Sequence, residues 1–513
     1  MLRFGTAGLR GPLQDGPDGM NVDTVSRATA GLADWLRGRC LGGGVVVVGR
    51  DARNGSAEFA AATAEIFAAA GFSVLTLPRP LPTPLVAFAV RELGAVAGVQ
   101  ITASHNPATD NGYKVYLDGG AQLIPPADAE IETAIDAVRE PIPRADPAAG
   151  GLDPRITAAV GDGNDAGEEL VRRYLARVAA LPGAIGGAGA RADIRIALTA
   201  LHGVGGATAV AALRAAGFAD VHVVAEQFEP DPAFPTVAFP NPEEPGATDL
   251  LLTLADRVGA DLAIALDPDA DRCAIGVPTP AGWRMLRGDE TGVLLGDRVL
   301  RTAPPDALVA TTIVSSRLLS KVATARGARY AETLTGFKWL ARAGDGLVYA
   351  YEEAIGHCVD PAAVRDKDGI SAAVVAADLV AALKAAGRSL IDELDDYAVE
   401  FGLHAGDQVS LRLADVADGA AMVARLRAAP PDEIAGAPVK YTDMSQVRGR
   451  MRTDALVFEG SSARIVIRPS GTEPKLKCYL EVVEPVDDRA GLSAARTSAA
   501  QQLSALRAFC EQL

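Results

Sequence analysis

Gly43-Gly44-Val45-Val46-Val47-Val48-Gly49 is the stretch that decides the fold class of this chain. Four β-branched residues in a row, bounded by glycines, are typical of a short strand buried on both faces, as in a parallel sheet. An Ala-rich helix is expected next at 58–70, a second strand at 73–77 and a third strand ending at Ile101. This alternation of strands and helices predicts an α/β unit.

The same alternation restarts twice further along the chain. The second unit is predicted from strands at 194–198, 221–224 and 262–266 with a helix at 207–216. The third has helices at 289–301 and 316–325 and strands at 307–311 and 346–351. After Phe401 the pattern changes to an α+β unit, with strands at 408–413, 463–468 and 476–483 and helices at 416–428 and 490–513. We therefore predict an α/β protein of three related α/β units plus a C-terminal α+β domain, with domains at 1–188, 189–287, 288–402 and 403–513. Residues 146–167 are rich in Ala, Gly, Asp and Pro and look like an excursion from the first unit.

The bulk composition excludes several classes of function. The chain has 513 residues, 49% of them hydrophobic, and a net charge of −16. An acidic protein repels nucleic acid and anionic membranes, and no run of 18 apolar residues occurs that could cross a bilayer. The five cysteines are scattered and form no C-x-x-C pair, so reduced thiols in a cytoplasmic enzyme are the expectation. The sequence does not indicate an oligomeric state.

A serine loop, Thr102-Ala103-Ser104-His105-Asn106-Pro107, follows the third predicted strand. Open α/β sheets bind ligands at the carboxyl ends of their strands, and a serine held there can act as a nucleophile. Ser and Asn also favour turns and helix caps, so this motif alone does not decide between the two interpretations.

An aspartate loop, Asp267-Pro268-Asp269-Ala270-Asp271-Arg272, also follows a predicted strand. Carboxylates at alternate positions of an extended loop project to one side and suit Mg²⁺, which prefers oxygen ligands. An EF-hand starts in the same way but needs Gly at its sixth position and Glu at its twelfth, where this chain has Arg272 and Pro278. The remaining alternative is a solvated acidic loop, which is costly without a cation.

Three more segments combine polar groups with strand ends. The stretch Arg468-Pro469-Ser470-Gly471-Thr472-Glu473-Pro474-Lys475 offers hydroxyls, backbone N–H groups and two cations to a phosphate, although it is not a P-loop. Thr335-Gly336-Phe337-Lys338 lies at a predicted strand-to-helix junction. Tyr351-Glu352-Glu353-Ala354-Ile355-Gly356-His357 ends a strand with paired carboxylates, which suit either sugar hydroxyls or a structural ion pair.

Taken in order, these motifs resemble the α-D-phosphohexomutase family over nearly the whole chain. The N-terminal Gly5-Thr6-Ala7-Gly8-Leu9-Arg10-Gly11 belongs to the same pattern. The resemblance implies four domains around a central cleft and a phosphosugar mutase that converts hexose 1-phosphate and hexose 6-phosphate (glucose, mannose or both) into one another. It also implies Mg²⁺, a phosphoserine and a sugar 1,6-bisphosphate that is both intermediate and activator. Small sugar phosphates are then the expected partners.

The resemblance also assigns roles to single residues. Ser104 would carry the phosphoryl group, and Asp267, Asp269, Asp271 and a phosphoserine oxygen would bind the metal. Arg10, His105 and Lys114 would surround the phosphoserine. The substrate-binding residues would be Arg272, Thr335, Gly336, Lys338, Glu352, Glu353, Arg468, Ser470, Gly471, Thr472 and Lys475.

The chain departs from many hexomutases at Ala354, where they carry a serine. Together with Asp366-Lys367-Asp368-Gly369, this resembles the branch that contains phosphopentomutase and many bacterial phosphosugar mutases. Hexose recognition is therefore open at this point, as is the choice between glucose and mannose. A phosphopentomutase, a sugar 1,6-bisphosphate synthase, a metal-dependent phosphatase and a non-catalytic sensor are the alternatives. The intact Ser104 and aspartate loop argue against the sensor, and the complete phosphate loop argues against the phosphatase.

Overall fold

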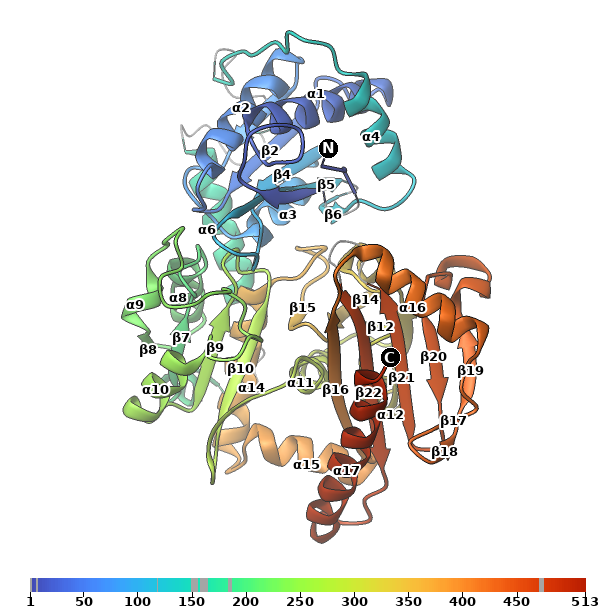
Figure 1. Ribbon diagram of the computed structural model, residues 1–513. Coiled ribbons are helices and arrows are strands. Elements are labelled where there is room, and N and C mark those ends of the chain that lie inside the picture. Colours follow the sequence, from blue (N-terminus) through green and yellow to red (C-terminus); the bar gives the residue numbers. More distant parts are fainter. Residues whose placement is uncertain are drawn as a thin grey trace. The chain divides into compact units, whose positions relative to one another are not determined.

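The computed structural model describes residues 2–5, 8–117, 119–148, 156, 165–182, 187–469 and 475–513 (Figure 1). The chain forms two compact units. Unit 1 comprises Met1–Thr291 with Leu347–Gly387, and unit 2 comprises Gly292–Gly346 with Arg388–Leu513. Each unit is therefore built from two separate stretches of sequence.

The first sheet of unit 1 is mixed. Its central strands β2 (Val45–Arg50), β3 (Ser73–Thr76) and β4 (Ala97–Ile101) are parallel and have the order β4-β2-β3. The antiparallel strands β5 (Asp110–Leu117), β1 (Leu9–Pro12) and β6 (Ala121–Gln122) extend it beyond β4. The helices of this region are α1 (Val22–Gly38), α2 (Ser56–Ala69), α3 (Thr83–Glu92), α4 (Ala127–Ala137) and α6 (Ala166–Ala179).

The second sheet of unit 1 has the order β11-β10-β9-β7-β8. Strands β7 (Arg195–Thr199), β8 (Asp220–Val223) and β9 (Leu262–Leu266) are parallel, and the hairpin β10 (Cys273–Thr279) and β11 (Gly282–Met285) is added antiparallel to β9. Its helices are α7 (Gly187–Ala192), α8 (Gly206–Ala215), α9 (Ala225–Phe228) and α10 (Asp249–Val258).

A helix from much later in the sequence completes unit 1. Helix α14 (Gly369–Ala385) has 14 of its 17 residues buried and packs against α6, α7 and α8 as well as β9 and β10. A helix that is apolar all round has to be buried in this way. The short antiparallel pair β14 (Leu347–Glu352) and β15 (Gly356–Cys358) precedes it.

Unit 2 is dominated by an antiparallel sheet of order β16-β22-β21-β20-β19. The strands are β16 (Leu403–Arg412), β19 (Lys440–Asp443), β20 (Leu456–Glu459), β21 (Ala463–Pro469) and β22 (Lys475–Glu484). Helices α16 (Val416–Ala428) and α17 (Leu492–Glu511) pack on this sheet. The earlier stretch supplies the parallel strands β12 (Leu308–Thr312) and β13 (Arg329–Thr333), with helices α12 (Leu318–Ala325) and α13 (Phe337–Leu340). Helix α11 (Gly288–Leu300) crosses from unit 1 into unit 2, and α15 (Leu390–Phe401) belongs to unit 2.

The predicted strands and helices are found within a few residues of their expected positions. The α16 and β9 bounds match the prediction, while β16 begins five residues earlier than expected. The expectations omitted α1, α3, α14 and α15 and several antiparallel strands, among them β5 and β10. Most of the predicted excursion at 146–167 lies outside the described residues, and the domain boundaries stay a prediction. No single helix in the described ranges is long and apolar enough to cross a membrane.

Candidate active site

The serine loop is a strained turn at the carboxyl end of β4. Ser104 has a φ of 53°, a left-handed conformation that is uncommon for a residue with a side chain. Its N–H group donates to Thr102 Oγ1 at 2.9 Å, and its hydroxyl donates to Asp267 Oδ2 at 2.7 Å. The side chain is buried. The turn thus directs the serine hydroxyl at the aspartate loop of the second sheet.

A buried arginine holds this turn from the opposite side. The guanidinium of Arg53 donates to the backbone carbonyls of Ser104 at 2.7 Å, Asn106 at 2.5 Å, Pro107 at 2.7 Å and Asp110 at 3.1 Å. Strain of the kind seen at Ser104 persists only where surrounding contacts fix it, and the fork of an arginine can bind several acceptors at once. Arg53 therefore fixes the conformation of the serine loop.

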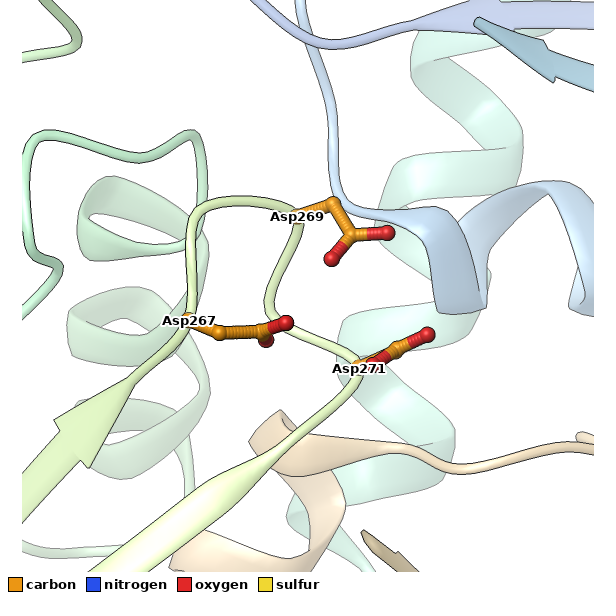
Figure 2. A group of neighbouring side chains, drawn as sticks. All are labelled: Asp267, Asp269 and Asp271. Carbon is orange, nitrogen blue, oxygen red and sulfur yellow. The ribbon is translucent and has the colours of Figure 1, made fainter. Parts of the chain in front are cut away.

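The three carboxylates of the aspartate loop converge. Each offers an oxygen within 4.8 Å of the others, and all three side chains are buried. Figure 2 shows Asp267, Asp269 and Asp271 leaving the same side of the loop that follows β9. Ala270, between two of them, has a φ of 54°, which bends the loop so that alternate side chains point together. The convergence expected from the sequence spacing is present.

Two lysines lie against this acidic group. Lys114 Nζ donates to Asp269 Oδ2 at 2.6 Å and Asp271 Oδ2 at 2.8 Å, and Lys367 Nζ lies 3.3 Å from Asp271 Oδ2. Burial alone would raise the pKa of Asp269 and of Asp271, but the ammonium of Lys114 keeps both pKa values below the ordinary one. Asp267 has no lysine partner among the described residues. Burial and its two acidic neighbours therefore raise its pKa well above the ordinary value.

These residues fit a hard divalent cation. Within the described part of the chain, Oδ1 of Asp269 and Oδ1 of Asp271 are buried without a hydrogen-bond partner. Such carboxylate oxygens are costly in a protein interior unless a cation or a donor reaches them. Two of the three carboxylates thus have an unpartnered oxygen, and together with Asp267 and the neighbouring serine hydroxyl they form an all-oxygen donor set, which Mg²⁺ prefers.

A second loop supports the aspartate loop from behind. The N–H of Val204 donates to the carbonyl of Pro268 at 2.8 Å, and a Cβ on Gly203 would lie 2.3 Å from Pro268 Cα. The preceding residue, His202, has a φ of 59°, and its Nε2 makes a hydrogen bond of 2.8 Å with Thr236 Oγ1. The position of the aspartate loop therefore depends on the close approach of residues 202–204.

The sugar loop, residues 351–357, joins β14 to β15 in unit 1. Burial raises the pKa of Glu352 to about 7, although Lys367 and Arg272 oppose that rise. A Cβ on Gly356 would lie 2.5 Å from the Lys367 side chain, so the loop packs directly on this lysine. Ile355, a β-branched residue, has a φ of 53°. Strain at this loop, as at Ser104 and Ala270, is typical of a functional site.

The remaining predicted residues of unit 1 lie around the serine. Arg10 donates to Asn106 Oδ1 at 3.1 Å, and the N–H of Arg272 donates to Asp267 Oδ1 at 3.0 Å. His105 Nδ1 lies 3.4 Å from Ser104 Oγ. Burial, together with the cationic Arg272 and Arg10, lowers the pKa of His105 well below 6.5, so its imidazole is neutral at pH 7.

The other predicted residues belong to unit 2 or are not described. Gly336 has a φ of 105° at the start of α13, which explains why glycine stands between Thr335 and Phe337. Lys338 lies over the ring of Trp339. Arg468 and Lys475 lie at the ends of β21 and β22, while Ser470, Gly471 and Thr472 lie outside the described residues.

Sequence reasoning missed several residues of this site. Lys367 is held between Asp271 and Asp366, and Asp366 accepts hydrogen bonds from Tyr116 and Gln122. In the sequence, Asp366-Lys367-Asp368-Gly369 indicates only which branch of the family the chain resembles, although three charged residues directly before the apolar run of α14 are a usable signal for a site. The sequence signal for Arg53 is weaker. It consists only of an oppositely charged pair, Asp51 and Arg53, directly after the end of β2.

Comparison with known proteins adds an independent line of evidence. The models of the four phosphoglucomutase/phosphomannomutase domains match in order. The alpha/beta/alpha domains I, II and III match residues 1–141, 172–281 and 287–398, and the C-terminal domain matches 409–492. The predicted fold class of three α/β domains and one C-terminal domain is thereby confirmed.

Individual relatives match over most of the chain. A probable phosphomannomutase of Haemophilus influenzae is 42% identical over 90% of this chain and 93% of its own length. The phosphopentomutase of Homo sapiens is 34% identical over 94% of this chain and 85% of its own length. In fold, the chain is similar to the crystal structure of the phosphoglucomutase parafusin from Paramecium, with a TM-score of 0.72 and 19% identity over 98% of this chain and 94% of that one.

Proposed function

The chain belongs to the phosphoglucomutase/phosphomannomutase family, and from this premise we propose that it is a phosphosugar mutase in which Ser104 carries the phosphoryl group. Enzymes of this family are isomerases that move a phosphate within one sugar. The proposed reaction interconverts hexose 1-phosphate and hexose 6-phosphate through a sugar 1,6-bisphosphate.

The contact between Ser104 and Asp267 is the main support for the proposal. The hydroxyl of Ser104 lies 2.7 Å from an oxygen of Asp267, inside a buried group of three carboxylates and two lysines. A serine with only a structural role has no reason to sit in a strained turn among buried charges. A phosphoryl carrier has to sit there, because phosphoryl transfer is catalysed mainly by placing the partners and neutralising charge.

In the first half of the reaction, a free hydroxyl of the sugar monophosphate attacks the phosphorus on Ser104. The bond between phosphorus and Ser104 Oγ breaks as the bond to the sugar oxygen forms, and the proton lost by the attacking hydroxyl ends on Ser104 Oγ, which regains its hydroxyl. The product is the sugar bisphosphate, and Ser104 is left without phosphate. In the second half, Ser104 Oγ attacks the other phosphate and releases the isomeric monophosphate.

The cationic residues of the site have distinct tasks in this scheme. Lys114 is charged, since its carboxylate partners Asp269 and Asp271 outweigh burial and raise its pKa, and it would add positive charge beside the metal-binding carboxylates. Arg10, which donates to Asn106 in the serine loop, would face the same phosphate. Arg53 keeps the serine in place and exposes none of its N–H groups to substrate in this arrangement.

Mg²⁺ would be held by Asp267, Asp269 and Asp271, and when bound it would supply positive charge to the phosphoryl oxygens. The sugar would be held by Glu352 and Glu353. The phosphate that does not react would be held by the loop between Arg468 and Lys475. The bisphosphate would also serve as activator by restoring the phosphate on Ser104.

A phosphopentomutase is the second candidate, and one observation favours it. Ala354 offers a methyl group at the position where many hexomutases have a serine hydroxyl, and the sugar loop has no other hydroxyl besides that of Tyr351, which donates to Asp289. Relatives named phosphopentomutase and phosphoribomutase match this chain as well. We therefore expect turnover of hexose phosphates with weak discrimination against pentose phosphates.

The Ser104→Ala variant tests the proposal. It should remain folded and lose mutase activity by on the order of 10⁴-fold or more, as expected for the loss of a nucleophile. Conversion of glucose 1-phosphate to glucose 6-phosphate would be measured with a coupled dehydrogenase, next to the release of free phosphate. Near-normal mutase turnover in the variant would refute the role of Ser104, and phosphate release by the wild type would indicate a phosphatase instead.

A further inference from the structure

Unit 2 contains a segment of unusual charge. The arginine loop, residues 444–455, connects β19 to β20 and carries Arg448, Arg450 and Arg452 within five residues. All three side chains are exposed. In the described part of the chain none of the three makes an ion pair or a side-chain hydrogen bond, whereas other arginines of unit 2, such as Arg427, Arg489 and Arg507, are paired with carboxylates. Three unneutralised cations are conspicuous in a chain with a net charge of −16.

The carboxylates beside the arginine loop are already neutralised. Arg427 of α16 pairs with Asp443, directly before the loop, at 3.0 Å and with Asp454, inside the loop, at 2.6 Å. Asp415 and Asp418, at the start of α16, cap that helix. The positive charge of the loop is therefore available to a ligand from outside.

The loop has a defined conformation. Met444 and Met451 pack onto a buried cluster that includes Val457 and Val466 of the sheet. The N–H of Arg452 donates to the carbonyl of Gly449 at 3.3 Å, and Gly449 has a φ of 83°, which favours glycine. The three arginines are thus presented on a tight turn anchored by two methionines.

The register of the sheet shows at which end the loop lies. Asp443 pairs with Leu456, Leu456 with Ile467, and Pro469 with Leu476. The arginine loop consequently leaves the sheet at the same end as Arg468 and Lys475. Leu334, directly before Thr335, packs on the same buried cluster as the two methionines. At the opposite end of the sheet Lys440 and Arg464 lie beside Glu459, and Arg464 pairs with it at 3.8 Å. The three exposed arginines without a carboxylate partner are therefore at the end that also carries Arg468 and Lys475.

From this placement we propose that the arginine loop is an anion-capture surface for phosphate monoesters, which attracts the phosphate groups of sugar phosphates toward Arg468 and Lys475. This inference rests on the proposed function. A phosphate monoester carries nearly two negative charges at pH 7, so a protein of net negative charge repels it at long range. A local group of uncompensated arginines reverses that field and raises the rate of encounter. The sugar bisphosphate, with two such groups, should be attracted most.

Removal of the three charges tests this inference. The triple variant Arg448→Gln, Arg450→Gln, Arg452→Gln should show a kcat/KM for glucose 1-phosphate that is lower by about five- to tenfold at an ionic strength of about 20 mM. The difference should vanish at about 300 mM, where the field is screened. The matched control is the triple variant Arg139→Gln, Arg214→Gln, Arg257→Gln, which removes the same charge from exposed arginines of unit 1.

Calorimetric titration in the Ser104→Ala background separates binding from turnover. Glucose 1,6-bisphosphate should bind about tenfold more weakly when the loop arginines are replaced, with a smaller loss for glucose 1-phosphate and little change in the control. Equal salt dependence and equal affinities in the loop variant and the control would overturn the inference and leave the proposed function standing. If the Ser104→Ala protein with an unchanged arginine loop binds neither sugar phosphate, the proposed function is overturned instead.

Discussion

The serine hydroxyl and three carboxylates illustrate how much of this site is set by single residues. The identity of Ser104 and the aspartates follows from short motifs, because a strand end and the spacing of alternate carboxylates are local properties. Arg53 and Lys367 act on the same group but come from distant parts of the chain. Their function becomes visible only when the fold has brought them there.

We predict that the residue at position 354, an alanine in this chain, affects sugar specificity. A site built to hydrogen-bond a substrate hydroxyl rejects analogues that lack it, and a methyl group gives no such discrimination. Replacement Ala354→Ser should shift the ratio of kcat/KM for glucose 1-phosphate to that for ribose 1-phosphate toward the hexose, by about tenfold. The ratio would be measured for both proteins with the same preparation of bisphosphate. An unchanged ratio would show that position 354 does not set specificity, and a wild type without pentose activity would contradict the relaxed site.

Asp368 gives a prediction for the dependence of stability on pH. Burial raises the pKa of this carboxyl to about 6, although it caps α14 and accepts a hydrogen bond of 2.8 Å from Tyr174. The folded state therefore binds the proton more tightly than the unfolded state. Its contribution to stability is complete at low pH and is lost as pH rises from the unfolded pKa near 3.8 to the folded pKa near 6.

The variant Asp368→Asn lacks this titration but keeps an acceptor for the helix cap. The free energy of unfolding of the wild type minus that of the variant should fall by about 2 kcal/mol between about pH 4.5 and pH 7. Urea titrations at a series of pH values measure it. A difference that is constant over this range would show that the pKa of Asp368 is the same in the folded and unfolded states.

At the scale of elements, the parallel strands were predictable and the antiparallel ones were not. Strands such as β2 and β9 are continuous apolar runs, which sequence periodicity detects. Strand β5 contains the buried Asn111 and Lys114, whose side chains donate hydrogen bonds to residues far away in the sequence, Ser56 and Asp269. Hydrogen bonds from buried polar side chains to distant residues leave no local pattern in the sequence. The sequence therefore predicts neither β5 as a strand nor Lys114 as a residue on it.

The contact between residues 202–204 and the aspartate loop leads to a further prediction. A methyl group on Gly203 would lie 2.3 Å from Pro268 Cα, and no flexible side chain is there to yield. Gly203→Ala should displace the aspartate loop and weaken Mg²⁺ binding by about tenfold, as for other supports of metal ligands.

The Mg²⁺ affinity would be measured by calorimetry on purified protein, independently of turnover. Gly38→Ala is the matched control, because nothing lies within 4 Å of a Cβ at that position. Equal Mg²⁺ affinity of both variants and the wild type would mean that residues 202–204 do not position the aspartate loop.

The whole molecule is divided in a way that the linear order of motifs does not suggest. Unit 1 contains residues 1–291 but needs 347–387 as well, because α14 packs against α8 and against β9 and β10 of the second sheet. We expect residues 1–291 alone to expose a large apolar face, to bind the dye ANS and to aggregate. The same segment joined by a flexible Gly/Ser linker to 347–387 should be monomeric and unfold cooperatively. A truncated 1–291 that is monomeric and cooperative would contradict the role given to α14.

The late position of α14 in the sequence also delays the completion of unit 1 during synthesis. The second sheet is complete on the ribosome once β11 has emerged at Met285, but the helix that covers it begins only at Gly369. At about 5–20 residues per second, the segment from Met285 to the end of the helix at Ala385 takes roughly 5 to 20 s to translate. Throughout that delay the nascent chain presents Leu262–Leu266 and its neighbours on a sheet without their covering helix. We therefore expect the yield of folded enzyme to depend on chaperones that can shield an uncovered sheet, and on how quickly the ribosome reaches residue 385.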